Sequence, residues 1–149
     1  MAQQVIDVTA TTKADPVSVY ALLADGSTWP GWSPIGSFEL IAPGAGTPEG
    51  LGAVRLFTTG RHKSRERVVT CEPGKAFAYE LEAGLPLQDY GAVITLLPGG
   101  GGTTINWRST FRAKVPGTGG IYRRELGKFI KKTVEGLTAA ADRAHSPSS

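Results

Sequence analysis

The chain has 149 residues, of which 40% are apolar, a size typical of one domain around a single core. Its 20 glycines and 10 prolines cluster between apolar runs, which argues against a helical bundle and favours a meander of strands. No run approaches the roughly 18 to 20 apolar residues of a spanning helix, so we expect no integral membrane association. Cys71 is the single cysteine and the first residues lack a signal-peptide pattern, so we expect a cytoplasmic protein.

The net charge of +3 raises the question of a nucleic-acid partner. One basic cluster alternates at period two, as on the wet face of a strand, and another lies on the polar side of a predicted helix. We therefore expect solvated faces and no nucleic acid, and we rank an anionic-membrane module lowest because exposed aromatics do not interleave with the charges. The clusters are Arg61, Lys63, Arg65 and Arg67, and Arg123, Arg124, Lys128, Lys131 and Lys132.

The first part of the chain predicts one strand followed by short helices. Residues 4–12 are β-branched and alternating, as in a strand. Asp15 before Pro16 predicts a helix start, with the carboxylate capping free amides, and Gly26 ends that helix. Residues 27–36 hold two tryptophans between prolines and a glycine, which predicts a short helix or turn.

From Phe38 onward, apolar runs separated by turn residues predict six further strands in a meander. A loop rich in glycine and proline interrupts them at 43–52. The predicted strands lie within residues 38–42, 53–59, 63–72, 75–83, 87–97 and 103–115.

The last segment predicts a long amphipathic helix, because its apolar residues fill one stripe at helical spacing. It is the only element long enough to cover the apolar face of a curved sheet, which leaves a space for large side chains or a pocket. The chain is thus expected to be one α+β domain over residues 1–144, with a disordered tail at 145–149. The stripe consists of Tyr122, Leu126, Phe129, Ile130, Val134, Leu137 and Ala141.

This order of elements resembles the START-like, or helix-grip, superfamily (SRPBCC), shared by the major birch pollen allergen, steroid-transfer domains and polyketide cyclases. Residues 24–41 are similar to the stretch after the first helix in polyketide cyclase/dehydrase and lipid transport-like proteins, and Gly52–Arg55, Glu66–Pro73 and Gly102–Trp107 look like later landmarks. The resemblance spans residues 4 to about 141. The resemblance implies a ligand cavity. It does not define one function, because relatives bind sterols, flavonoids, acyl chains or polyketides and only some of them are enzymes.

Conventional catalytic and metal constellations are scarce. The only histidines are His62 and His145, so we expect no metal site and no cofactor. The sequence has neither a phosphate-binding glycine loop nor a serine nucleophile elbow. We expect Cys71 to be a small buried apolar residue, and a catalytic Cys71–His62 dyad is the alternative.

Strand alternation selects the residues that face the predicted pocket. Aromatic side chains at every second position of three strands point to the inner face, where each is either a ligand contact or ordinary core. The predicted ligand-binding set is Trp32, Arg55, Phe57, Glu66, Tyr79, Leu81, Tyr90, Trp107 and Phe129.

The charged residues of this set, Arg55 and Glu66, are the candidates for a catalytic or polar binding role. Arg55 shares a face with Phe57, and Glu66 shares one with Val68, unless a bulge intervenes. The two charges then either pair across neighbouring strands or polarise a ligand. In an enzyme, Arg55 would stabilise an oxyanion, Tyr79 would donate a proton and Glu66 would act as the base.

Two tryptophans, Trp29 and Trp32, either plug the open end of the sheet or wall an entrance whose lid is the loop 43–51. The favoured function is binding or transport of a hydrophobic small molecule, such as a lipid, sterol or polyketide-like compound. The alternative is a polyketide cyclase or dehydratase. An exposed sheet edge is compatible with a monomer or a homodimer.

Overall fold

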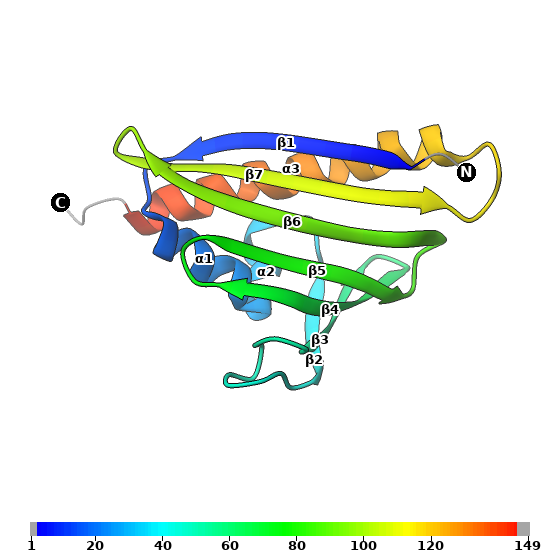
Figure 1. Cartoon of the computed structure of the whole chain (residues 1–149), viewed down its shortest axis with the longest axis horizontal. Coiled ribbons are helices and arrows are strands. Elements are labelled where there is room, and N and C mark those ends of the chain that lie inside the picture. The colour runs from blue at the N-terminus through cyan, green and yellow to red at the C-terminus, as the bar shows by residue number, and fades with distance from the viewer. Residues whose placement is uncertain (1–2, 146–149) are drawn as a thin grey trace.

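The computed structural model describes residues 3–145 and holds a seven-stranded sheet and a long C-terminal helix (Figure 1). Short helical elements follow the first strand, as predicted. In chain order the elements are β1 (Gln4–Thr12), α1 (Pro16–Ala24), the 3-10 turn η1 (Gly26–Thr28), α2 (Trp29–Trp32), β2 (Ser37–Ala42), β3 (Val54–Thr59), β4 (His62–Glu72), β5 (Ala76–Ala83), β6 (Leu87–Gly99), β7 (Gly102–Ala113) and α3 (Gly119–His145).

Every neighbouring pair of strands is antiparallel, and the order across the sheet is β1-β7-β6-β5-β4-β3-β2. Only β1 joins out of sequence, next to β7. The sheet curves so that α3 lies along its inner side beside β1 and β7, with α1 and α2 near the C-terminal part of α3 (Figure 1). The predicted helix-grip architecture is confirmed.

One local prediction at the start of α1 is wrong. The Asp15 carboxylate makes no hydrogen bond to a backbone amide of the helix and accepts a hydrogen bond from the Ser18 hydroxyl instead. Pro16 still occupies the first helical turn, where its missing N–H costs nothing. The helix ends at Ala24, and Gly26 begins the 3-10 turn.

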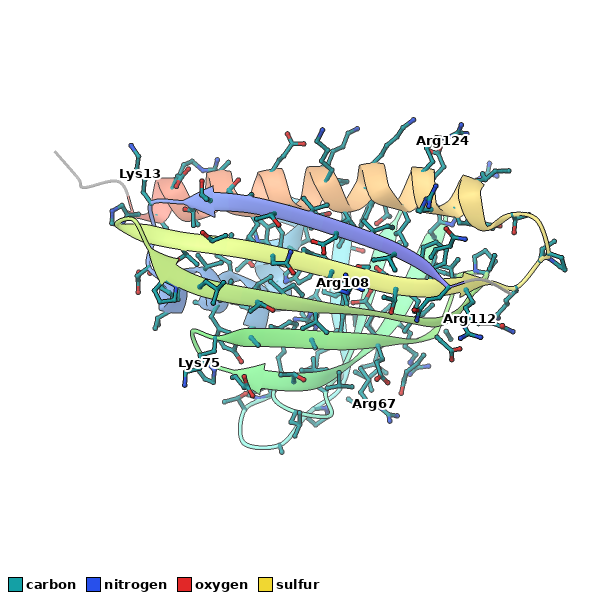
Figure 2. The ribbon with its side chains drawn as sticks, turned by 45° about the horizontal axis from the view of Figure 1, so that its top comes forward. Lys13, Arg67, Lys75, Arg108, Arg112 and Arg124 are labelled. Atoms are coloured by element: carbon teal, nitrogen blue, oxygen red, sulfur yellow. The ribbon has the colours of Figure 1, made fainter. Side chains whose placement is uncertain are left out.

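The amphipathic stripe of α3 faces the sheet as expected. Ile130, Val134, Leu137 and Ala141 are buried, whereas every predicted basic residue of the polar stripe is exposed, including Arg124 (Figure 2). The helix continues to His145, one residue beyond the predicted domain boundary. The rest of the predicted tail, 146–149, lies outside the described residues. Within the described chain no helix is long and apolar enough to cross a membrane.

The other basic cluster also lies on a solvated face. The side chains of Arg61, Lys63, Arg65 and Arg67 are all exposed, and Arg67 forms an ion pair with Glu82 on the next strand. Figure 2 shows Arg67, Arg108 and Arg112 on the outer side of the sheet. Inward positions of the same strands therefore carry the core.

Candidate functional site

An internal cavity of about 490 Å³ lies between the inner face of the sheet and the first half of α3. This volume is within the range of sites that hold small molecules. Most of the predicted ligand-binding residues line it, as strand alternation and the helical stripe required. These are Phe57, Glu66, Tyr79, Tyr90, Trp107 and Phe129.

The mouth of the cavity is marked by its exposed lining residues. Ile121 and Glu125 in the first turns of α3 are exposed, and so is His62 at the β3–β4 turn. Leu85 and Pro86, between β5 and β6, complete this rim. The loop 43–51 contributes no described residue to the lining, so the expectation that it forms the lid is wrong.

The two tryptophans after α1 have different positions. Trp29 lines the cavity and lies with its ring centroid 4.9 Å from that of Phe57. Trp32 lies outside the lining, 4.9 Å from the Trp29 ring, and its indole N–H donates to the Thr28 hydroxyl at 3.0 Å. Trp32 therefore fills the core. The sequence pattern Trp-Pro-Gly-Trp identified both tryptophans as candidates but did not indicate which of them faces the cavity.

Arg55 does not reach the cavity, which corrects two expectations. Its side chain is fully buried, and its guanidinium carbon lies about 5 Å from the ring centroids of Trp29, Phe57 and Phe77. Nη1 donates to the carbonyl oxygen of Leu23 at 3.0 Å and to Glu49 at 3.4 Å. Arg55 therefore pairs with a loop carboxylate, and the structure gives it no access to a ligand oxyanion.

The register between β3 and β4, which places Arg55 and Glu66, is the one expected without a bulge. The two strands pair continuously from Val54 to Thr59, with Arg55 opposite Glu66. Irregularities occur on the other sides of these strands, in β2 beside Arg55 and between β4 and β5 beside Glu66 and after Val68. Leu81, opposite Glu66 on β5, is half-buried and is not among the cavity-lining residues.

Glu66 is a buried carboxyl group in the lining of the cavity. It is 6% exposed, its Oε2 accepts a hydrogen bond from the Ser64 hydroxyl at 2.8 Å, and its Oε1 has no partner among the described residues. Burial raises the pKa of Glu66 to about 7, against the opposing effects of Arg55 and Ser64. A carboxyl with this pKa exchanges protons near neutral pH.

Two tyrosines and a tryptophan line the same cavity as Glu66. The hydroxyl oxygens of Tyr79 and Tyr90 lie 3.2 Å apart, within hydrogen-bonding distance. Burial raises the pKa of both phenols, and the Glu66 charge acts in the same direction, so both stay protonated. The indole N–H of Trp107 is buried and has no acceptor among the described residues. The cavity is thus apolar with one polar region.

Residues of α3 and the loops supply lining that strand alternation missed. Ile121 and Leu126 lie on the helix and Ile35 follows α2; of these, only Leu126 belonged to the predicted apolar stripe. Cys71 is half-buried and is not in the lining, so the structure gives no support to a dyad with His62. Among residues 3–145 no group of three or more His, Cys, Asp or Glu side chains could hold a metal ion.

Comparison with known proteins places this architecture in a family. A sequence profile described as polyketide cyclase/dehydrase and lipid transport matches residues 3–142. The chain belongs to this family. No functionally curated protein matches the chain significantly.

Several solved structures share the fold of this chain. A START superfamily protein from Mycobacterium smegmatis superposes with a TM-score of 0.81 at 13% identity, over 94% of this chain and 98% of that one. The protein TTHA0849 from Thermus thermophilus gives 0.74 at 20% identity, over 96% and 99%. A norcoclaurine synthase point mutant from Thalictrum flavum, in complex with a transition state analogue, gives 0.76 at 15% identity, over 97% and 98%. At these identities the likeness concerns the fold.

Proposed function

We propose that this member of the polyketide cyclase/dehydrase and lipid transport family binds a hydrophobic small molecule, of the lipid, sterol or polyketide type, in the cavity under α3. The observation that carries the proposal is the 490 Å³ cavity itself, lined by Trp29, Phe57, Phe129 and other apolar side chains. A preformed, mostly apolar concavity with a few polar groups is the usual form of a small-molecule site.

The rim of the cavity supports entry of an apolar ligand. Ile121 is 55% exposed and lines the cavity, so the opening has an apolar side chain at its edge. Leu126 and Phe129 continue an apolar path along α3 from this rim inward. Transport follows from reversible entry along that path.

The test is binding of a neutral fluorescent probe, N-phenyl-1-naphthylamine, to the purified protein after denaturing extraction and refolding. We expect saturable enhancement of probe fluorescence with one site per chain. Native mass spectrometry of the protein before extraction identifies any molecule that copurifies. Absence of probe binding by a refolded protein with native circular dichroism would overturn the proposal.

A second candidate, a cyclase- or dehydratase-type enzyme, is favoured by Glu66. A carboxyl with a pKa near 7, within a cavity and beside two protonated phenols, has the properties of a general base. In this mechanism the Glu66 carboxylate removes a proton from carbon next to a ligand carbonyl, and the Tyr79 hydroxyl donates a hydrogen bond to the resulting enolate oxygen. Arg55 has no part in it.

Proton exchange distinguishes the enzyme from a carrier. In D2O, an enzyme of this type accelerates replacement of the α-hydrogens of 2-tetralone by deuterium, because the proton that Glu66 takes is lost to solvent and a deuteron returns to carbon. The rate is followed by proton NMR. If wild-type protein and Glu66→Gln give the same exchange rate, the enzyme hypothesis is rejected and only the carrier function is retained.

A further inference from the structure

The polar region of the cavity consists of Glu66, Tyr79, Tyr90 and Trp107, from the four adjacent strands β4 to β7. Each of these side chains is more than nine-tenths buried. Two of their polar atoms, Glu66 Oε1 and Trp107 Nε1, have no hydrogen-bond partner among the described residues. Buried polar atoms are nearly always paired, so such atoms in the wall of a cavity indicate that a bound molecule pairs with them.

The chemistry of the two atoms differs. The indole N–H is only a donor, so it needs an acceptor on the ligand. Above pH 7 Glu66 is mostly ionised, and an ionised carboxylate oxygen is only an acceptor, so under these conditions Glu66 Oε1 needs a donor. The neighbouring Tyr79 and Tyr90 hydroxyls lie within hydrogen-bonding distance of each other and keep the region polar.

Most ligand head groups satisfy only part of this demand. A hydrocarbon satisfies neither atom, and a ketone or ether accepts from Trp107 but offers no proton to Glu66. An ammonium group has no lone pair for Trp107. A carboxylate would meet the Glu66 charge without a compensating cation, because Arg55 lies outside the lining and the ionisable nitrogen among the described lining residues is on His62, at the mouth.

We propose that the ligand carries a neutral hydroxyl group, as an alcohol, phenol or enol, and that this hydroxyl enters first and lies in the polar region between Glu66 and Trp107. Its oxygen accepts from the indole N–H and its proton is donated to Glu66. The apolar skeleton then extends toward Phe129 and the mouth. This inference rests on the proposed function, since it names the ligand class of the same cavity.

Displacement of N-phenyl-1-naphthylamine by matched naphthalenes tests the proposal. 2-Naphthol and 2-methylnaphthalene have nearly the same shape and differ by a hydroxyl in place of a methyl group, and 2-naphthoate adds a negative charge. We expect 2-naphthol to displace the probe about 10-fold more tightly than 2-methylnaphthalene, since one well-made hydrogen bond contributes about that factor. We expect 2-naphthoate to bind most weakly. Equal affinities of the first two, or tightest binding of 2-naphthoate, would overturn the proposal.

Variants test whether the preference for a hydroxyl group depends on Trp107 Nε1 and Glu66 Oε1. Trp107→Phe keeps an aromatic ring but removes the N–H, and should lower the 2-naphthol to 2-methylnaphthalene ratio about 3- to 10-fold. Trp32→Phe makes the same change in the core outside the cavity and should leave the ratio unaltered. Glu66→Gln keeps an acceptor oxygen but removes the charge, so the hydroxyl preference should persist while 2-naphthoate gains affinity.

The outcomes separate this inference from the proposed function. If the probe itself does not bind the refolded wild-type protein, the proposed function fails. If the probe binds and the hydroxyl preference is absent, the cavity function stands and the polar-region assignment is overturned. Should Trp107→Phe fail to fold, Glu66→Gln still decides the matter: a gain in 2-naphthoate affinity with an unchanged preference for 2-naphthol supports the proposal, and an unchanged 2-naphthoate affinity overturns it.

Discussion

Arg55 donates from Nη1 to Glu49 Oε1 at 3.4 Å, although the carboxyl opposite Arg55 in the sheet register belongs to Glu66. Glu49 reaches inward from the loop between β2 and β3 and also accepts a hydrogen bond from the amide of Gly26 at 2.7 Å. It thereby connects that loop, the turn after α1 and the buried guanidinium. Glu66 makes no ion-pair contact with Arg55, and its burial raises its pKa although the Arg55 charge and the Ser64 hydrogen bond act in the opposite direction.

Glu49→Gln removes the carboxylate that is hydrogen-bonded to the fully buried Arg55, whereas the Glu66 charge acts on Arg55 without such a contact. Leaving a buried charge without its partner is strongly destabilising, so we expect the free energy of unfolding in urea to fall by about 3 kcal/mol. The matched change Glu82→Gln removes the partner of the exposed Arg67 and should cost about 1 kcal/mol or less. Equal effects of the two changes would contradict the assignment of Glu49 as the main partner of Arg55.

Glu66 makes stability depend on pH in a defined direction. Its pKa is 4.5 when unperturbed and about 7 in the folded protein, so between these values the folded state binds the proton more tightly than the unfolded state. The contribution of Glu66 is present in full below pH 4.5 and is lost as pH rises through about 7, a change of about 3 kcal/mol.

Glu66→Gln isolates this contribution because glutamine does not titrate. We expect the variant to gain stability relative to wild type as the pH is raised from about 5 to about 8, by up to about 3 kcal/mol in urea unfolding. Comparing the difference between the two proteins at each pH cancels the titration of the other groups. A difference that stays constant with pH would show that Glu66 titrates normally.

At Gly136 the helix α3 approaches the backbone at the end of α2 closely. A Cβ atom there would lie 1.6 Å from the carbonyl oxygen of Trp32, a backbone atom that cannot move aside as a side chain does. We therefore expect Gly136→Ala to lower the melting temperature and to destabilise by at least about 2 kcal/mol, despite the better helix propensity of alanine.

Gly127 in the same helix provides the control, because a Cβ atom at that position meets nothing within 4 Å. Gly127→Ala should stabilise by about 0.5 to 1 kcal/mol through helix propensity alone. Opposite shifts of the melting temperature in the two variants are the expected result. Stabilisation by both would mean that α2 and α3 pack less tightly than the structure indicates.

Leu126 tests whether ligands occupy the space under α3. Leu126→Trp adds an indole to the lining of the cavity, so we expect affinity for N-phenyl-1-naphthylamine to fall by about 10-fold or more as the bound volume is reduced. Leu97→Trp places the same ring on β6, where the side chain is 58% exposed, and should leave the affinity unchanged. Unaltered binding in both variants would place the probe outside the cavity.

The alternation of side chains in strands and the spacing of apolar residues in helices are local properties, and the sequence predicts both correctly. Tyr79, Tyr90 and Trp107 face inward because side chains alternate across a strand. Phe129 faces the cavity because it belongs to the apolar stripe of α3. The same reasoning placed Arg55 and Glu66 inside, where both are buried.

The alternation of side chains along a strand does not determine where the covering helix leaves a cavity above the sheet. Arg55 and Glu66 are opposite each other on one face, yet Trp29, Phe57 and Phe77 enclose the first and the cavity opens onto the second. The position of Glu49 depends on the path of a glycine-rich loop that no periodicity describes. The amino-acid sequence by itself therefore determined the strands, the helix and the faces they bury. Only the tertiary structure decided which inward residues meet the cavity, because the curvature of the sheet and the course of the connections set the distance between packed layers.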